Sequence, residues 1–175
     1  MRRLTAWCAL VALALPVTAR GQAVPWSQHG TVSQRVGLTD IAIAYNRPVA
    51  RGRALFGERS LVPWGRVWHP GADSATTISF SRDVSIEGQD LAAGRYTLWT
   101  IPTPDRWTVI FSRALGVFHI PYPGEARDAL RVTVAPEQGA HMEVLAFYFP
   151  VVGPDSAVLR LQWGTTIVPI RIHTK

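Results

Sequence analysis

Short runs of alternating apolar and polar residues, separated by turn-forming residues, fill the chain after residue 40. In the first run, Ile41, Ile43 and Tyr45 alternate with alanines. A period of two places every second side chain on the same face of a β-strand. Similar runs follow at residues 77–80, 84–86, 95–101, 107–111, 130–134, 142–149, 158–163 and 167–172. We therefore predict an all-β fold, a single antiparallel β-sandwich of jelly-roll or immunoglobulin-like type.

Turn and breaker residues set the limits of these runs. The chain has 14 glycines and 13 prolines, which argues against long helices. Residues 135–140 have the composition of a loop, and residues 125–130 allow a single helical turn. Pro169 interrupts the last run, and because proline cannot donate to a strand ladder we expect an edge strand or a late start there.

The N-terminus has the pattern of a secretory signal peptide. Arg2 and Arg3 precede an apolar segment from Leu4 to Val17, and the small residues of Gly21-Gln22-Ala23 form a cleavage site. We predict that residues 1–23 are removed and that residues 24–175 form one domain, periplasmic or secreted. An uncleaved N-terminal anchor stays open as the alternative. We expect no membrane span after removal of the signal.

The only cysteine, Cys8, lies within this leader, so the mature chain has no thiol and forms no disulfide. Trp7 occupies a position where a lipidation motif needs a small residue, which argues against a lipid anchor. Loss of three leader arginines lowers the formal net charge from +6 to +3. The sequence has neither a dense basic stripe nor a recognised module for nucleic acid, and we predict no nucleic-acid partner.

Residues 46–73 are rich in arginine and tryptophan and lack strand alternation. Five arginines stand there against one acid, Glu58, before Asp73. A loop of this length in a compact domain is uncommon unless it has a function. Arginine forks bind carboxylate or phosphate, and tryptophan faces stack on sugar rings and cations. The predicted ligand-binding residues are Tyr45, Arg47, Arg53, Trp64, Trp68, His69 and Asp73.

A structural interpretation of the same loop stays open. Trp64 and Trp68, four positions apart, would then plug one end of the sandwich. Arg47 and Arg53 would satisfy buried carbonyl groups or pair with Asp73. We expect Arg47→Ala to destabilise the fold and Arg53→Ala to have a milder effect, because Arg47 adjoins the predicted strand that ends at Tyr45.

Several motifs follow one another with specific order and spacing from Ser33 to Val134. They are Ser33-Gln34-x-Val36-Gly37, Tyr45-x-Arg47-Pro48, Arg51-Gly52-Arg53, Phe56-Gly57, Leu61-Val62-Pro63-Trp64-Gly65-x-Val67-Trp68, Gly71-Ala72-Asp73-x-Ala75-Thr76-Thr77-Ile78, Ala93-Gly94-x-Tyr96-Thr97-Leu98 and Trp107-Thr108-Val109-Ile110-Phe111. They resemble a secreted bacterial family catalogued as domain of unknown function 2911. The resemblance implies an exported, mostly β protein. It does not imply any particular activity, because none is assigned to the family. His69 and Asp73 depart from the family pattern, where arginine and asparagine are common.

Three functions remain open. The first is a non-catalytic binding module for a small anionic or carbohydrate ligand. The second is a hydrolase that uses Asp73 with His69. The third is a cell-envelope structural or assembly protein that binds another protein. The five histidines form no metal-binding pair of the usual spacing, and we predict neither a metal nor another cofactor. The partner is therefore an unknown small molecule or an envelope component.

Overall fold

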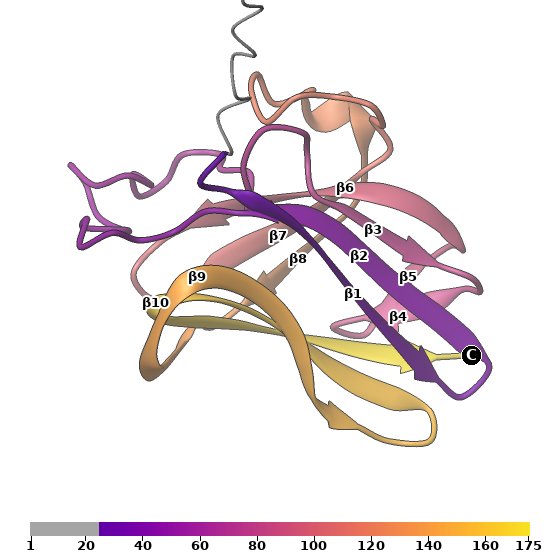
Figure 1. Ribbon diagram of the computed structural model, residues 1–175. Helices are drawn as coiled ribbons and strands as arrows, with labels where there is room; N and C mark the ends of the chain where they lie inside the picture. Colours follow the sequence, from indigo (N-terminus) through magenta and orange to yellow (C-terminus); the bar gives the residue numbers. More distant parts are fainter. Residues whose placement is uncertain (1–24) are drawn as a thin grey trace, which may run out of the picture.

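Two antiparallel sheets pack face to face in the computed structural model, which describes residues 25–175 (Figure 1). The six-stranded sheet has the order β1 (Gln28–Val36), β2 (Thr39–Arg47), β3 (Thr77–Phe80), β6 (Gly94–Pro102), β7 (Trp107–Ser112) and β8 (Asp128–Val134). The four-stranded sheet has the order β5 (Gln89–Leu91), β4 (Val84–Ile86), β10 (Ser156–Thr174) and β9 (Glu137–Val152). The predicted all-β sandwich is confirmed. The predicted signal peptide lies outside the described residues.

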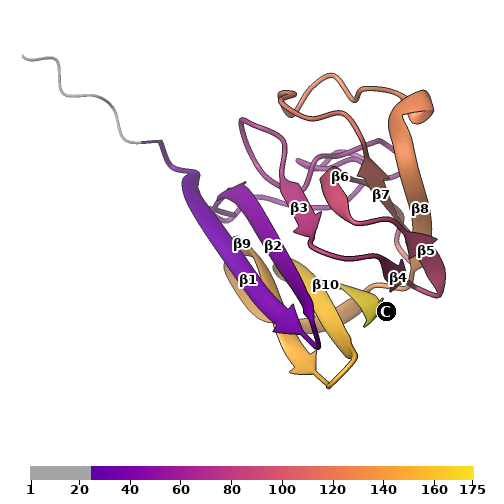
Figure 2. The ribbon, with the colours of Figure 1, turned by 90° about the vertical axis from the view of Figure 1, so that its right-hand side faces the viewer.

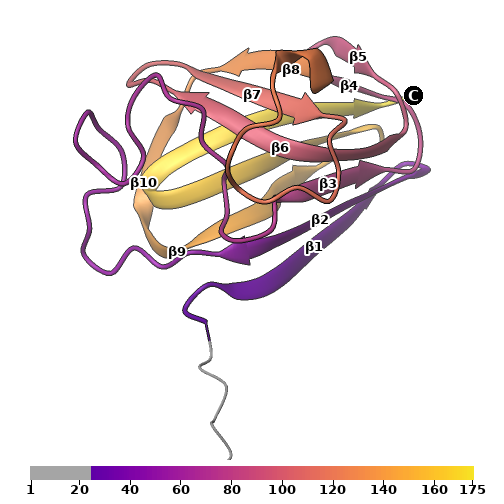
Figure 3. The same cartoon turned by 90° about the horizontal axis from the view of Figure 1, so that it is seen from above.

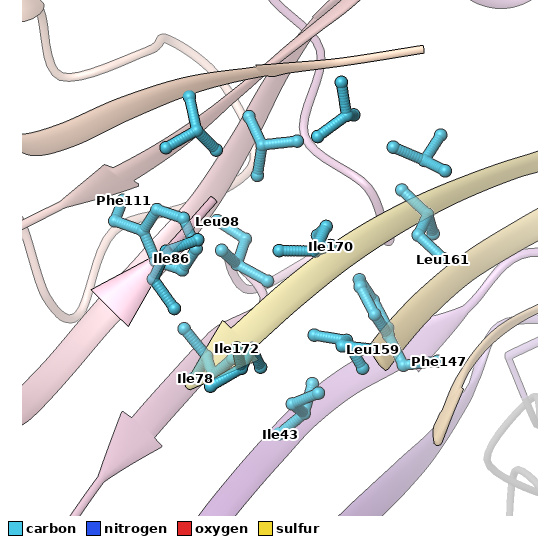
Figure 4. Close-up of a cluster of buried hydrophobic side chains, with 14 of the residues drawn as sticks. Ile43, Ile78, Ile86, Leu98, Phe111, Phe147, Leu159, Leu161, Ile170 and Ile172 are labelled. Atoms are coloured by element: carbon cyan, nitrogen blue, oxygen red, sulfur yellow. The ribbon is translucent and has the colours of Figure 1, made fainter. Parts of the chain in front are cut away.

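The core fills the space between the two sheets. Ile43, Ile78 and Phe111 of the first sheet meet Leu159 and Ile172 of the second, and each of these side chains is at most 1% exposed (Figure 4). The alternation seen in the sequence places these residues inward. Full burial of one such side chain contributes about 1.5–3 kcal/mol relative to exposure. Apolar burial therefore holds the domain together without a disulfide.

Strand β1 was missed by the sequence pattern. It pairs with β2 along its whole length, from Gln28 opposite Arg47 to Val36 opposite Thr39. Most of its side chains are polar or partly exposed on both faces, so its sequence lacks the apolar alternation of the other strands. On this side of the sandwich β1 and β2 lie next to β9 (Figure 2).

The last two predicted strands are one long strand, β10. Its ladder with β9 shifts register around Gly164, whose φ of 59° is a left-handed conformation that favours glycine. The expectation that Pro169 marks an edge strand or a late start is wrong, because β10 runs from Ser156 and lies between β4 and β9. Pro169 is tolerated because it falls after the ladder with β9 ends at Ile167 and before the ladder with β4 begins at Ile172.

The remaining connections are short or irregular. Only Ala135 and Pro136 separate β8 from β9, so the predicted loop 135–140 is shorter than expected. A 3₁₀ turn at Glu125–Arg127 occupies part of the predicted helical turn. No helix within residues 25–175 has the length and apolar character needed to cross a membrane. The long segment after β2 lies at one end of the sandwich, beside β9 and β10 (Figure 3).

Candidate functional site

Residues 48–76, which we call the end loop, are anchored to both sheets. Ala50 donates a backbone hydrogen bond to Glu143 (2.8 Å), and Leu145 donates one to Pro48 (2.9 Å), so the loop begins as a short partner of β9. Further along, the backbones of Trp68 and Thr100 exchange two hydrogen bonds of 2.7 and 2.8 Å. These contacts fix the backbone of the end loop against β9 and against β6.

An aromatic cluster closes this end of the sandwich. Phe56 lies at its centre, with its ring centroid 5.2 Å from that of Trp107 and 5.7 Å from that of Trp68. Trp64 stacks on Phe56 at 6.1 Å, with the two ring planes 15° apart. Trp68 in turn lies parallel to Trp163 of β10, 6.0 Å away. Because such pairs add about 0.5–1.5 kcal/mol each beyond burial, Trp64 and Trp68 stabilise the end loop.

Beside this cluster lies a first cavity of about 380 Å³, which lies near the lower end of the size range of small-molecule pockets. It is walled by the end loop on one side and by β9 and β10 on the other. Its lining consists of Arg53, Leu55, Phe56, Trp64, Pro104, Trp107, Pro136, Gln138, His141, Trp163, Gly164, Thr165 and Thr166. The indole Nε1 of Trp107 is buried without a hydrogen-bond partner in the described structure. The cavity thus combines aromatic faces with scattered polar groups.

A second cavity of about 370 Å³ adjoins the first. Arg53 and Trp163 line both cavities. The rest of the second lining is Trp26, Ser27, Pro48, Val49, Arg51, Leu61, Trp68, Gly71, Ala72, Asp73 and His119. Of the predicted ligand residues, Arg53 and Trp64 therefore line the first cavity, and Arg53, Trp68 and Asp73 line the second.

Arg53 is held by its own loop. Its Nε donates to the carbonyl oxygen of Ala50 (2.9 Å), and its Nη2 donates to that of Val49 (2.6 Å). Its Nη1 makes no hydrogen bond to the described residues. The bonds from Nε and Nη2 therefore orient the guanidinium group, and the N–H groups of Nη1 can donate to a further acceptor.

Two other predicted ligand residues join the sheets instead. The backbone N–H of Phe147 donates to the hydroxyl of Tyr45 (3.1 Å), and the two rings meet edge to face at 4.9 Å. The Nε of Arg47 donates to the carbonyl oxygen of Leu145 (3.1 Å). The structure places both side chains between β2 and β9. The bond from Arg47 to a carbonyl oxygen is the kind of contact that the structural interpretation of the end loop describes.

His69 is buried away from both cavities, with only 3% of its surface exposed. Its Nε2 accepts a hydrogen bond from the backbone N–H of Thr76. Burial, followed by the charge of His119, lowers the pKa of His69 to about 3, so the ring is neutral near pH 7. Its remaining proton is on Nδ1, which has no partner among residues 25–175.

Asp73 stands apart from His69. It is exposed, and its backbone is in a left-handed conformation, with φ of 58°. Its carbonyl oxygen accepts hydrogen bonds from the backbone N–H and the Nδ1 of His119 at 2.9 and 3.0 Å. The described structure has no hydrogen bond between the side chains of Asp73 and His69.

The first cavity also contains residues that sequence reasoning missed. Gln138 and His141 come from β9, and Trp163 and Thr165 come from β10, roughly a hundred residues from the end loop. The Nε2 of His141 donates to Glu143 (2.9 Å), and this contact, followed by the backbone N–H of Arg51, lowers the pKa of the Glu143 carboxyl. In the described part of the chain, no three His, Cys, Asp or Glu side chains are grouped to hold a metal ion.

Comparisons with known proteins give one match. The family model described as "Protein of unknown function (DUF2911)" matches residues 27–172. Neither the curated proteins nor the solved structures contain a match.

Proposed function

Since the chain belongs to the DUF2911 family, whose description states no activity, we propose from the geometry that it is a non-catalytic binding module for a carbohydrate. The ligand's sugar ring occupies the first cavity. We further propose that the module works after export, in the periplasm or outside the cell, as the predicted signal peptide indicates.

The observation that carries this proposal is the pairing of an aromatic wall with a polar wall in one cavity. The partly exposed rings of Phe56 and Trp64 line the first cavity from the end loop, and sugar rings present an apolar face that stacks on such rings. The side chains of Gln138 and Thr166, on the strands of the second sheet, supply hydrogen-bonding groups for hydroxyls. This is the chemistry that a sugar needs from a binding site.

The same cavity offers little for catalysis. Acid–base hydrolysis of a glycoside requires two carboxyl groups across the bond, and no Asp or Glu is among the described residues that line the first cavity. The hydrolase alternative gains no support from His69, because its Nε2 is engaged by Thr76 and its ring is closed off from both cavities. Binding without chemistry is the function that the geometry favours.

One observation favours the assembly alternative as a second candidate. Phe118 and Ile120, in the connection between β7 and β8, expose 54% and 66% of their surface. Contiguous exposed apolar surface marks protein-binding sites, and these two exposed side chains lie two residues apart. Retention of a purified envelope protein on immobilised wild-type protein, lost in Phe118→Ser, would support this candidate.

An oligosaccharide array tests the carbohydrate proposal. The array carries neutral, uronic-acid, sulfated and phosphorylated oligosaccharides, and the members that bind are then titrated by calorimetry. We expect Trp64→Ala to weaken their binding by roughly tenfold or more, equivalent to about 1.4 kcal/mol. Because Trp64 also stacks on Phe56, Gln138→Ala provides a second variant at an exposed residue, and we expect it to weaken binding with an unchanged Tm.

Phe118→Ala is the matched control, since Phe118 is an exposed aromatic residue outside the lining of both cavities. Its binding should equal that of the wild type. An array with no bound member, or binding that survives both Trp64→Ala and Gln138→Ala, would overturn the carbohydrate proposal.

A further inference from the structure

The two cavities share Arg53 and Trp163 but differ in the number of arginines in their linings. Arg51 and Arg53 both line the second cavity, whereas Arg53 is the only arginine in the lining of the first. Neither arginine forms an ion pair within residues 25–175. Two cationic forks in the lining of one cavity are the pattern of a site for a carboxylate, sulfate or phosphate group.

We propose that the second cavity is a subsite for an anionic group and that the ligand is an acidic saccharide spanning both cavities. The inference rests on the proposed function for its sugar ring, which occupies the first cavity. The anionic group of the same ligand reaches Arg51 and Arg53.

The two arginines are held in place before any ligand arrives. Arg53 is fixed by its two hydrogen bonds to the carbonyl oxygens of Val49 and Ala50. The guanidinium of Arg51 lies over the ring of Trp26, with Cζ 5.4 Å from the ring centroid. The backbone N–H of Arg51 is bound by Glu143 (2.6 Å). Orientation in advance lowers the entropic cost of binding an anion.

Two carboxylates near these arginines limit the positive charge. Glu143 is engaged by the backbone N–H of Arg51 and by His141, and it does not line the second cavity. Asp73 does line it, and its side chain makes no hydrogen bond to the described residues. Two arginines against this one carboxylate leave the lining net positive. It follows that removal of the charge of Asp73 should strengthen anion binding.

The shared residues connect the two subsites. Arg53 keeps Nη1 donors, and it lines both cavities. Trp163 also lines both, and Trp68, which lies parallel to it, lines the second. A ligand with a ring against Trp64 and an acidic group at Arg51 would therefore pass Arg53, which is exposed and lines both cavities.

Inorganic sulfate tests the anion subsite without any sugar. Titration followed by NMR should give saturable shifts of the indole N–H signals of Trp26 and Trp68. Arg51→Gln should weaken sulfate binding by roughly tenfold, equivalent to about 1.4 kcal/mol, and Asp73→Asn should strengthen it. Asparagine tolerates the left-handed backbone at residue 73, so the fold is kept. Arg82→Gln, an exposed arginine outside this cavity, is the control that should behave as the wild type.

Cellohexaose and its C6-carboxylated form test the spanning ligand. We expect the carboxylated form to bind roughly tenfold more tightly, with the preference lost in Arg51→Gln while cellohexaose binding remains. Trp64→Ala should weaken both. Equal affinity for the two oligosaccharides, or a preference that survives Arg51→Gln, would overturn the inference.

The outcomes separate this inference from the proposed function. If oligosaccharides bind on the array and Trp64→Ala weakens their binding, but sulfate gives no saturable shifts, the proposed function stands and the anion subsite is overturned. Saturable sulfate binding at Arg51, with no oligosaccharide bound in any assay, overturns the proposed function and the acidic saccharide together and leaves only an anion site.

Discussion

The Nε of Arg47 donates a hydrogen bond to the carbonyl oxygen of Leu145, 3.1 Å away, and thereby joins β2 of one sheet to β9 of the other. The bond lies where β2 ends and the end loop begins. Arg47 lines neither the first nor the second cavity, so this contact between the sheets favours a structural role over a ligand contact.

Arg47→Ala should therefore destabilise the fold. The change leaves the carbonyl oxygen of Leu145 without its partner, which costs roughly 1–3 kcal/mol. In a domain of this size, that lowers Tm by about 2–4 °C per kcal/mol. Scanning calorimetry measures the shift, with Arg82→Ala as the exposed control. A Tm equal to that of the wild type would contradict the structural role and return Arg47 to the ligand candidates.

Arg53→Ala should have the opposite profile, with a small effect on stability and a large effect on binding. The side chain is exposed, so water can replace its bonds to Val49 and Ala50, and we expect a loss below about 1 kcal/mol. Calorimetric titration with the carboxylated cellohexaose should show affinity reduced by roughly tenfold or more. Undiminished affinity would exclude Arg53 from both subsites.

His69 should make stability depend on pH. Its pKa is lowered from 6.5 to about 3 in the folded protein, so the unfolded chain binds the proton more tightly and acid favours unfolding. The contribution of neutral His69 to the free energy of unfolding is fully present above pH 6.5. As the pH falls toward 3, this contribution decreases by about 1.4 kcal/mol per pH unit. Between about pH 7.5 and pH 5 this amounts to about 2 kcal/mol.

Urea unfolding at several pH values measures this dependence. His69→Gln keeps an acceptor for the N–H of Thr76 and removes the titration, so its unfolding free energy should vary less with pH. The exposed His173→Gln should keep the wild-type slope. A His69→Gln slope identical to that of the wild type would mean that His69 is not the group responsible.

Processing of the chain gives a further prediction. Intact mass spectrometry of protein from the native host should find a mature chain that begins at or near Val24 and carries no lipid. A diacylated Cys8, or an intact leader, would contradict the predicted export route.

The sequence predicted most strands but not the cavity. Alternation identified strands such as β2 and β7, because their inward faces are apolar. It missed β1, in which only Val32 and Val36 are apolar and pack on the core, and it divided β10 at Gly164, where the ladder with β9 shifts register. Bulges and polar edge strands depend on the partner strand, which a local pattern does not contain.

The end loop stands out by its composition, but composition does not show where its side chains lie relative to the two sheets. The sequence predicted a larger destabilisation for Arg47→Ala than for Arg53→Ala, but it did not show that Arg47 contacts β9 while Arg53 lines the cavities. The sequence places His69 four residues before Asp73, which allowed a catalytic pair. In the structure, the ring of His69 is buried and accepts a hydrogen bond from Thr76. The polar wall of Gln138 and Thr166 comes from distant strands, and no spacing rule brings these residues together.

The pairing of Pro48 and Ala50 with β9 has a consequence for solubility. β9 is an edge strand, and unpaired strand edges recruit other chains. The end loop covers this edge at Glu143 and Leu145, and Pro48 has no N–H to offer a further strand. Substitutions that release the loop from β9 would therefore expose a template for self-association, so aggregation should accompany any loss of ligand binding caused at this anchor.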